Sequence, residues 1–304
     1  MLNPLTHQSR SKDPLGMFFL LANPTSGAGR GSAVKKLVVS YLIERGIAFT
    51  DISGTSYESA RTNLRSSLEK ERPEALIVIG GDGMVHLAIQ DLAESDIPLL
   101  LVPAGTGNDF ARSLQINMNS PITCLDHALS SPTVEVDLGR IGSKFFAEIL
   151  STGFDSRVNE RANRMRLSNR IKYNLAMLLE LPIFQPLDYE FTVDGVTFKK
   201  KAMLVAIANG ASYGGGMRIC PDADLSDGLF DVMFLEPVSK FEFIKVFPKV
   251  FKGTHISHPK VRIIRGRTVS IAARAVAYAD GERIGALPVT AEVAPKALRT
   301  WIHQ

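Results

Sequence analysis

Residues 75–83, ALIVIGGDG, place five consecutive apolar residues directly before a glycine-rich turn that carries one acid, Asp82. A continuous apolar run of this length is typical of a strand that is buried on both faces of a parallel sheet. The residues that follow Gly83 predict a helix. An acid inside a glycine loop at a strand end is costly to place unless it meets a metal ion or a helix terminus, so Asp82 indicates a nucleotide and Mg²⁺ site.

Two further loops of the same kind occur in the first half of the chain. Residues 23–29, NPTSGAG, follow the apolar run FFLLA, and residues 103–112, PAGTGNDFAR, follow LLLV. The first loop is neither a Walker A loop nor a GxGxxG motif, and by itself it is equally well explained as a strand-to-helix turn. Three such loops after successive parallel strands would lie along one sheet edge, where α/β proteins bind their ligands.

The periodicity of the sequence changes near Val134 and predicts two domains. Residues 16–135 alternate apolar strands with helices, which predicts an α/β domain. Residues 136–304 contain shorter segments with a period of two and a hairpin signal at Asp194-Gly195, which predicts a mainly antiparallel β domain.

Three segments of the chain do not follow this simple pattern of two domains. One helix is expected within the second domain, from Arg157 to Leu181. The tail from Pro295 to Ile302 is expected to be a strand or a turn of helix that packs on either domain, and the last residues can return to the first one. Residues 1–15 have no apolar core segment and are expected to form a flexible extension.

Composition limits the class of protein. The chain has 304 residues, 45% of them hydrophobic, but no apolar run approaches the roughly 20 residues of a membrane-spanning helix. Its two cysteines, Cys124 and Cys220, lack metal-ligand spacing and suit a reducing compartment, so a cytoplasmic location is expected. Residues 1–150 carry a net charge of −3 (13 basic, 16 acidic) and residues 151–304 carry +7 (22 basic, 15 acidic). A basic half is typical of proteins that bind nucleic acid or anionic membranes, and equally of a solvated lysine-rich face.

Two acidic segments stand out in the second half. Four aspartates lie within ten residues, from Asp222 to Asp231, and their repulsion has to be offset by a cation or by hydrogen bonds. An acidic surface turn closed by Asp227-Gly228 is the alternative. Asp280-Gly281-Glu282 follows the apolar segment from Val276 to Ala279 and is most simply a hairpin turn.

The ordered set NPTSG, GGDG, GTGNDFAR, GFD (153–155) and DGE (280–282) resembles the diacylglycerol kinase catalytic-domain family over nearly the whole chain. That family includes bacterial diacylglycerol kinases and YegS-like lipid kinases, and it is related to sphingosine and ceramide kinases. The resemblance implies an N-terminal α/β nucleotide-binding domain, similar to that of NAD kinases, and a C-terminal β-sandwich-like domain. The active site would lie in the cleft between them and transfer the γ-phosphoryl group of ATP to a lipid hydroxyl, that of diacylglycerol or a related lipid.

The same resemblance implies roles for individual residues. Glu282 would be the general base, and Asp82, Asp109 and Asp137 would organise Mg²⁺ and water. A structural Mg²⁺ would be held by Asp224, Asp227 and Leu229. ATP would contact Asn23, Pro24, Thr25, Ser26, Gly27, Gly81, Asp82, Gly83, Met84, Val85 and His86, with Thr106 near its phosphates and Thr55 on the adenine side.

Two residues depart from the family pattern. Where relatives have Thr and Asn after GGDG, this chain has Met84 and His86. Backbone contacts would survive these changes, because the N–H groups of the loop do not depend on those two side chains.

The expected partners follow from the resemblance. They are ATP, a membrane lipid and, through Arg157 to Lys172 or Lys199 to Lys201, an anionic membrane surface. Nucleic acid is not expected, and a homodimer is expected on frequency alone. Two alternatives remain: an NAD kinase-like enzyme that acts on a soluble acceptor, and a non-catalytic regulator that binds nucleotide or lipid.

Overall fold

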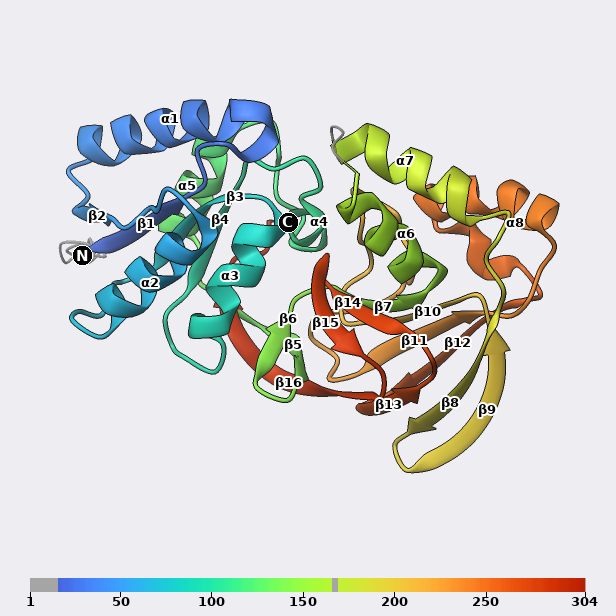
Figure 1. Cartoon of the computed structure of the whole chain (residues 1–304). Coiled ribbons are helices and arrows are strands. Elements are labelled where there is room, and N and C mark those ends of the chain that lie inside the picture. Colours follow the sequence, from blue (N-terminus) through green and yellow to red (C-terminus); the bar gives the residue numbers. More distant parts are fainter. Residues whose placement is uncertain (1–15, 166–168, 304) are drawn as a thin grey trace, which may run out of the picture.

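The computed structural model describes residues 16–165 and 169–303 (Figure 1). The predicted extension, residues 1–15, lies outside the described residues. Among the helices of the described ranges, none combines the length and the apolar character needed to cross a bilayer.

The first domain is a parallel four-stranded sheet with the strand order β2-β1-β3-β4. Every residue of β1, β3 and β4 is buried, as the continuous apolar runs predict. Helices α1 and α5 pack together on one side of this sheet, and α2 and α3 on the other (Figure 1). The elements are β1 Phe18–Ala22, η1 Ser26–Gly29, α1 Arg30–Glu44, β2 Phe49–Asp51, α2 Tyr57–Leu68, β3 Leu76–Gly80, α3 Asp82–Leu92, β4 Leu99–Pro103, α4 Asp109–Ser113 and α5 Pro121–Ser130.

The second domain contains two antiparallel six-stranded sheets. Their strand orders are β6-β5-β16-β13-β8-β9 and β12-β11-β10-β7-β14-β15. The strands are β5 Val134–Ile141, β6 Lys144–Phe146, β7 Ile149–Gly153, β8 Leu187–Val193, β9 Val196–Ala202, β10 Leu204–Ala208, β11 Phe230–Leu235, β12 Val261–Gly266, β13 Thr268–Ala272, β14 Val276–Ala279, β15 Glu282–Ala286 and β16 Val289–Thr300. The predicted α/β domain and antiparallel β-sandwich-like domain are both confirmed.

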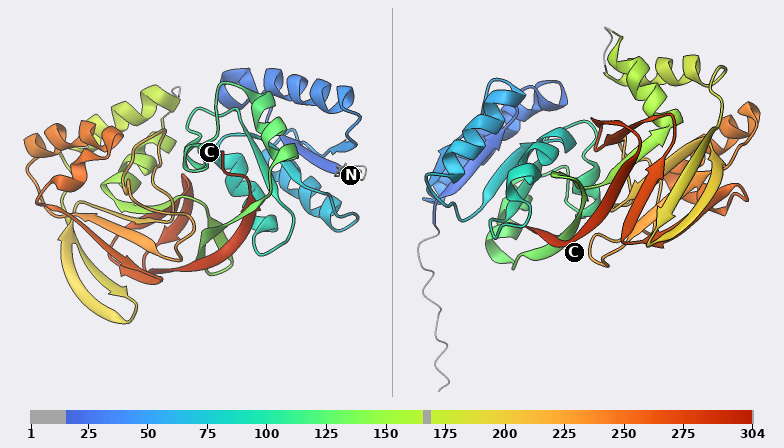
Figure 2. Two further views of the ribbon diagram at one scale, coloured as in Figure 1. Left: turned by 180° about the vertical axis from the view of Figure 1, so that it is seen from behind. Right: turned by 60° about the horizontal axis from the view of Figure 1, so that its bottom comes forward.

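The two sheets of the second domain lie face to face (Figure 2), and buried apolar side chains fill the space between them. Phe191 of β8 lies 5.4 Å from Phe234 of β11, ring centre to ring centre, and Phe146 lies 5.8 Å from Phe230. The hairpin predicted at Asp194-Gly195 joins β8 to β9. Along the strands, inward apolar residues alternate with outward polar ones, as a β-sandwich requires.

A layer of helices covers the outer face of the second sheet. It consists of α6 Phe154–Asn163, α7 Asn169–Glu180, α8 Lys240–Val246, η2 Phe247–Lys252 and η3 Thr254–Ser257. The prediction of one helix from Arg157 to Leu181 was wrong, because α6 ends at Asn163 and α7 begins at Asn169. A single helix of that length would extend about 38 Å. Two shorter helices bury Val158 and Ala176 against the same core.

The last strand connects the two domains. Beyond a bulge at residues 295–297, β16 continues its pairing with β5 as Leu298–Thr300. Leu298 and Trp301 are buried in the core of the first domain. Thr300 Oγ1 donates to the Leu99 carbonyl at 2.8 Å, and Trp301 Nε1 donates to the Ser131 carbonyl at 3.1 Å. The chain thus ends by packing on the domain with which it began.

Leu298→Ala tests the importance of this returning segment. Because Leu298 is fully buried, we expect the substitution to lower the free energy of unfolding by about 2–5 kcal/mol. Arg299→Ala is the control, because this partly exposed side chain ion-pairs with Glu135 at 3.4 Å and should contribute less than about 1 kcal/mol. Urea denaturation of the three proteins measures both. Equal stabilities would show that the first domain does not depend on the segment.

Candidate functional site

The three glycine-bearing loops are in contact at the carboxyl ends of β1, β3 and β4. A Cβ atom on Gly105 would lie 2.5 Å from the Gly81 Cα, and one on Gly107 would lie 2.5 Å from Asp82 Oδ2. The contact at Gly105 is with backbone and is too short for any other residue type, and a side chain at Gly107 would displace the Asp82 carboxylate, so both glycines let the loops approach each other in this arrangement. Asn108, at a φ of 56°, closes the third loop by accepting from the Gly105 N–H and donating to the Gly105 carbonyl.

Asp82 stands at the first position of α3, where the helix N-terminus faces the junction with the second domain (Figure 1). Its Oδ1 accepts from the Phe110 N–H at 3.1 Å. Burial, and then the nearby carboxylates of Asp109 and Asp280, raise the pKa of Asp82 to about 6. The site therefore carries an excess of negative charge, which a bound cation would offset.

The other two predicted metal-organising residues already hold the backbone. Asp109 accepts from the N–H groups of Gly215 and Gly216, each at 2.7 Å, and from Arg112 at 3.0 Å. Gly215 and Gly216 belong to the second domain, so Asp109 of α4 joins the two domains.

Asp137 is engaged in the same manner. Its two oxygens accept from the N–H groups of Gly228 and Lys296, both at 2.7 Å. Lys296 lies in the bulge of β16 with a φ of 54°. Asp137 therefore fixes the point at which β16 leaves the sandwich for the first domain.

Asp280 was not among the predicted site residues, although it begins the DGE turn. Its carboxylate accepts from the N–H groups of Ala147, Glu148 and Ile149 at 2.7, 2.9 and 3.3 Å. His86 Nδ1 lies 3.3 Å from Asp280 Oδ2 and is buried. The imidazole of His86 thus connects helix α3 of the first domain to the turn that carries Glu282.

Glu282 is exposed at the start of β15. The strand is positioned by α6, since Glu160 accepts from Arg283 Nε at 2.8 Å and from the Tyr278 hydroxyl at 3.0 Å. The pKa of Tyr57 on α2 is raised first by burial and next by the negative charge of the Glu282 carboxylate. Glu282 is therefore within electrostatic range of the first domain.

Glu148 is a second acid that the sequence did not reveal. It is buried, its Oε2 accepts from the Ser212 N–H at 3.4 Å, and its Oε1 has no hydrogen-bond partner among the described residues. Burial raises its pKa well above the usual range, and the charges of Asp280, Asp109 and Asp82 add to this. Its position within the apolar run AEIL gave no sign of this environment.

The residues predicted to contact the nucleotide differ in how far their side chains are exposed. Pro24, Thr25, Thr55 and Thr106 are exposed at the sheet edge. Asn23 closes its own loop by accepting from the Thr25 N–H at 3.0 Å and from the Thr25 hydroxyl at 2.8 Å. The side chains of Met84 and Val85 are buried in the first core, so only their backbone faces the loop. Ser26, Gly27, Gly81 and Gly83 line the same edge.

An arginine offsets the negative charge of the acidic turn between Asp222 and Asp231. Arg265 pairs with Asp231 at 2.8 Å and also with Asp227, whose other oxygen accepts from the Leu229 N–H. Asp224 accepts from the N–H and the hydroxyl of Ser226. Within residues 16–165 and 169–303, no group of three or more His, Cys, Asp and Glu side chains is arranged to hold a metal ion. A cation at this turn would have to displace Arg265 from Asp227.

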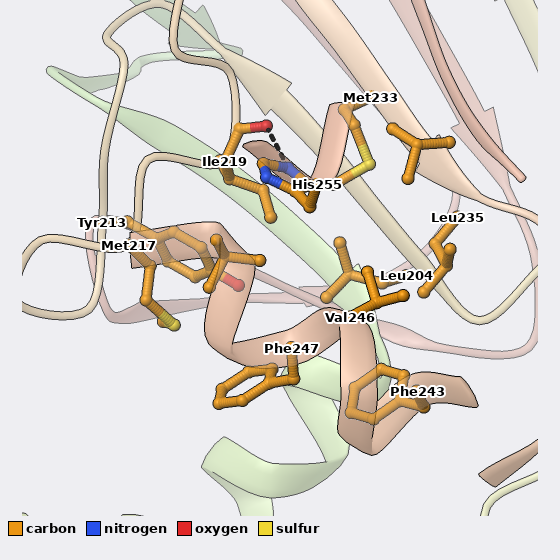
Figure 3. A pocket seen from close by; sticks show the side chains of 12 residues that line it. Leu204, Tyr213, Met217, Ile219, Met233, Leu235, Phe243, Val246, Phe247 and His255 are labelled. Atoms are coloured by element: carbon orange, nitrogen blue, oxygen red, sulfur yellow. Dashed lines mark hydrogen bonds between the residues drawn. The ribbon is translucent and has the colours of Figure 1, made fainter. Parts of the chain in front are cut away.

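An apolar cavity of about 40 Å³ lies beneath α8 and η2 (Figure 3). Its walls include Met233, Leu235 and Phe243, and His255 Nε2 lies 3.0 Å from the Ile219 carbonyl beside it. Tyr213 also lines it and belongs to the loop that binds Asp109. The cavity is large enough for only a few methylene groups, so a whole acyl chain would require its walls to move.

Comparisons with known proteins agree with this geometry. Residues 17–141 match the diacylglycerol kinase catalytic domain, and residues 148–302 match the YegS C-terminal NAD kinase beta sandwich-like domain. A diacylglycerol kinase of Mycobacterium tuberculosis is 38% identical over 293 residues, which cover 94% of each chain. One from Bacillus subtilis is 27% identical and covers 88% of this chain and 90% of its own.

Solved structures show the same fold. A diacylglycerol kinase structure from Bacillus anthracis superimposes with a TM-score of 0.75 at 18% identity, covering 97% of this chain and 99% of its own. Another from that organism reaches 0.80 at 20% identity, with 98% and 99% covered. On the family matches and the identity to the mycobacterial relative, this chain belongs to the diacylglycerol kinase catalytic domain family and carries a YegS-type C-terminal domain.

Proposed function

We propose that the protein is an ATP- and Mg²⁺-dependent lipid kinase that phosphorylates the hydroxyl of diacylglycerol or a related lipid. The observation that carries this proposal is the convergence of the three glycine loops with the Asp280–Glu282 turn where the two domains meet. Each domain contributes one half of a phosphoryl-transfer site: backbone N–H groups and an acid on one side, and a candidate base on the other.

The loops after β1 and β3 suit the phosphates of ATP. Backbone N–H groups and the start of α3 present positive potential there without needing the side chains that Met84 and His86 replace. We assign Asn23 to Gly27 and Gly81 to His86 to the nucleotide, with Thr106 near the phosphates and Thr55 toward the adenine.

Asp82 is the acid best suited to Mg²⁺. Burial and the charges of Asp109 and Asp280 raise its pKa, and it accepts from the Phe110 N–H, whereas Asp109 and Asp137 each accept from two backbone N–H groups. A bound Mg²⁺ would supply charge neutralisation for the transferred phosphoryl group. We assign to Asp109 and Asp137 the positioning of the loops around this site. At the acidic turn, Asp224, Asp227 and Leu229 would hold a structural Mg²⁺ only after Arg265 moves away.

Glu282 is proposed as the general base. An exposed carboxylate at the junction can accept the proton of a lipid hydroxyl while the nucleophile is oriented toward ATP. The hydrogen bonds that Asp280 accepts and the Glu160–Arg283 pair hold the two ends of the turn in place. We propose that the enzyme acts from the cytoplasm on lipids at the membrane surface.

A labelled-phosphate assay tests the proposal. The purified protein is incubated with γ-labelled ATP, Mg²⁺ and mixed micelles of diacylglycerol, phosphatidylglycerol, sphingosine or a polyprenol. We expect label in the lipid fraction, and in one lipid class above the others. Label in NAD alone would favour a soluble acceptor, and bound ATP without transfer to any acceptor would favour a regulatory binding protein.

Glu282→Ala is expected to lower kcat by about 10²–10⁴-fold, because proton acceptance by a positioned base contributes on this order. The dissociation constant for ATP, measured by calorimetry, should stay the same since Glu282 lies across the junction from the nucleotide loops. Glu292→Ala is the matched control, because this glutamate pairs with Arg140 on the other sheet. A kcat similar to that of the parent would remove Glu282 from the mechanism.

Asp82→Asn should abolish transfer yet stabilise the fold. The pKa of Asp82 is about 6 in the folded protein against an ordinary value of 3.8, so its ionisation costs stability as pH rises between those values. Above about pH 7 the variant should gain up to about 3 kcal/mol, and the gain should vanish below about pH 4. Thermal melting across pH measures this, with Asp96→Asn as an exposed control. Mg²⁺ should stabilise the parent more than the variant, and equal stabilisation would contradict the assignment.

A further inference from the structure

The helix layer of the second domain has an apolar outer face in addition to its buried inner one. In the segment α8–η2, Phe243, Val246 and Val250 point inward and line the cavity of Figure 3. On the outer side Phe241, Ile244 and Phe251 are 81%, 56% and 51% exposed. A helix that packs on a sheet needs only one apolar face, so the second one requires an explanation.

Helix α7 extends this outer face. Leu178 is 63% exposed, Leu175 and Leu179 are also exposed, and Ile183, just beyond the end of the helix, is 59% exposed. Phe154 of α6 joins the two segments at their inner side, because it packs edge-on against Phe184, which follows α7, at 5.4 Å and against Phe243 of α8 at 5.0 Å. The views of Figures 1 and 2 place α7 and α8 together on the outer side of the second domain.

Positive charge accompanies the apolar residues. The segment from Lys240 to Lys252 contains four lysines and one acid, Glu242, which pairs with His258. Lys245, Lys249 and Lys252 are exposed and have no acidic partner within 4.0 Å in the described part of the chain. Apolar side chains with unpaired lysines beside them are complementary to an anionic bilayer, which offers acyl chains below a negatively charged surface.

The two basic segments singled out from sequence fit this purpose less well. Lys199 to Lys201 lie on β9, an edge strand of the sandwich, and Lys199 pairs with Glu190 at 3.1 Å. Arg161 of α6 is paired at 2.8 Å with the buried Glu180. Within the arginine-rich segment, residues 166–168 lie outside the described residues.

We propose that the outer face of α7 and α8–η2 is the surface by which this protein docks on an anionic membrane, with Phe241 and Ile244 entering the bilayer. The inference rests on the proposed lipid kinase function and adds the membrane partner and its binding surface. The face borders the reaction site through α6, which packs against α7 and whose Glu160 accepts from Arg283 Nε, next to Glu282, at 2.8 Å. A lipid leaving the bilayer at α7 would approach the proposed base.

Sedimentation with vesicles tests the docking surface directly. The full chain is mixed, without ATP, with vesicles of phosphatidylcholine alone or with an equal part of phosphatidylglycerol. We expect binding to the anionic vesicles to weaken about tenfold or more in F241S/I244S, which loses apolar insertion. A similar loss is expected in K245E/K249E, and it should shrink at high salt.

The matched control is L37S/I43S on α1, because these side chains are 53% and 65% exposed but lie on the first domain. Its vesicle binding should stay within about twofold of the parent. Patch variants that bind like the parent, or a control that weakens equally, would overturn the proposal. A change in oligomeric state in the F241S/I244S variant, seen by analytical ultracentrifugation, would instead assign the face to a second copy of the chain.

Failure of this inference is distinguishable from failure of the proposed function. If the kinase function holds and the docking surface is correct, F241S/I244S phosphorylates a soluble short-chain diacylglycerol as the parent does but loses activity on long-chain diacylglycerol in anionic vesicles. Normal vesicle binding without phosphorylation of any lipid would refute the kinase function and leave the docking surface in place. Equal loss on both substrates would refute the docking role.

Discussion

Hydrogen bonds from backbone N–H groups to three buried carboxylates fix the junction of the two domains, since those to Asp109 cross between the domains and those to Asp137 and Asp280 shape the second domain beside it. Asp109 binds the 215–216 loop, Asp137 binds the bulge of β16, and Asp280 binds the start of β7 while facing His86. A buried carboxylate that lost these donors would carry an uncompensated charge, which costs several kcal/mol. The relative position of the glycine loops and the DGE turn, and hence the geometry of the site, depends on this set of bonds.

This arrangement separates acids with a structural task from acids available for chemistry. The oxygens of Asp109 and Asp137 are already hydrogen-bonded, whereas Asp82 carries charge that is penalised by burial and by its neighbours. Glu148 lies close by, and burial raises its pKa as well. Such a concentration of acids is unfavourable for stability in the free protein and would favour binding of the proposed cation and nucleotide, a trade-off that is common at functional sites.

The second domain is organised in layers that differ in their exposure to water. The sandwich core is closed between two sheets, and the helix layer closes the outer face of one of them. The same helices then expose a second apolar face with lysines beside it. Sheet, cavity, helix and outer face follow one another in that order, so the surface proposed for the membrane lies over the small cavity of Figure 3.

The sequence by itself determined the fold class and the position of the three loops, because buried parallel strands and glycine turns leave strong local patterns, as in residues 75–83. Short motifs in the sequence also predicted Asp82 and Glu282 as site residues. Only the tertiary structure decided that Asp109 and Asp137 hold backbone, that Asp280 and Glu148 belong to the junction, and that the tail returns to the first core. Those facts depend on contacts between residues far apart in the chain, such as His86 with Asp280, and no local pattern encodes them.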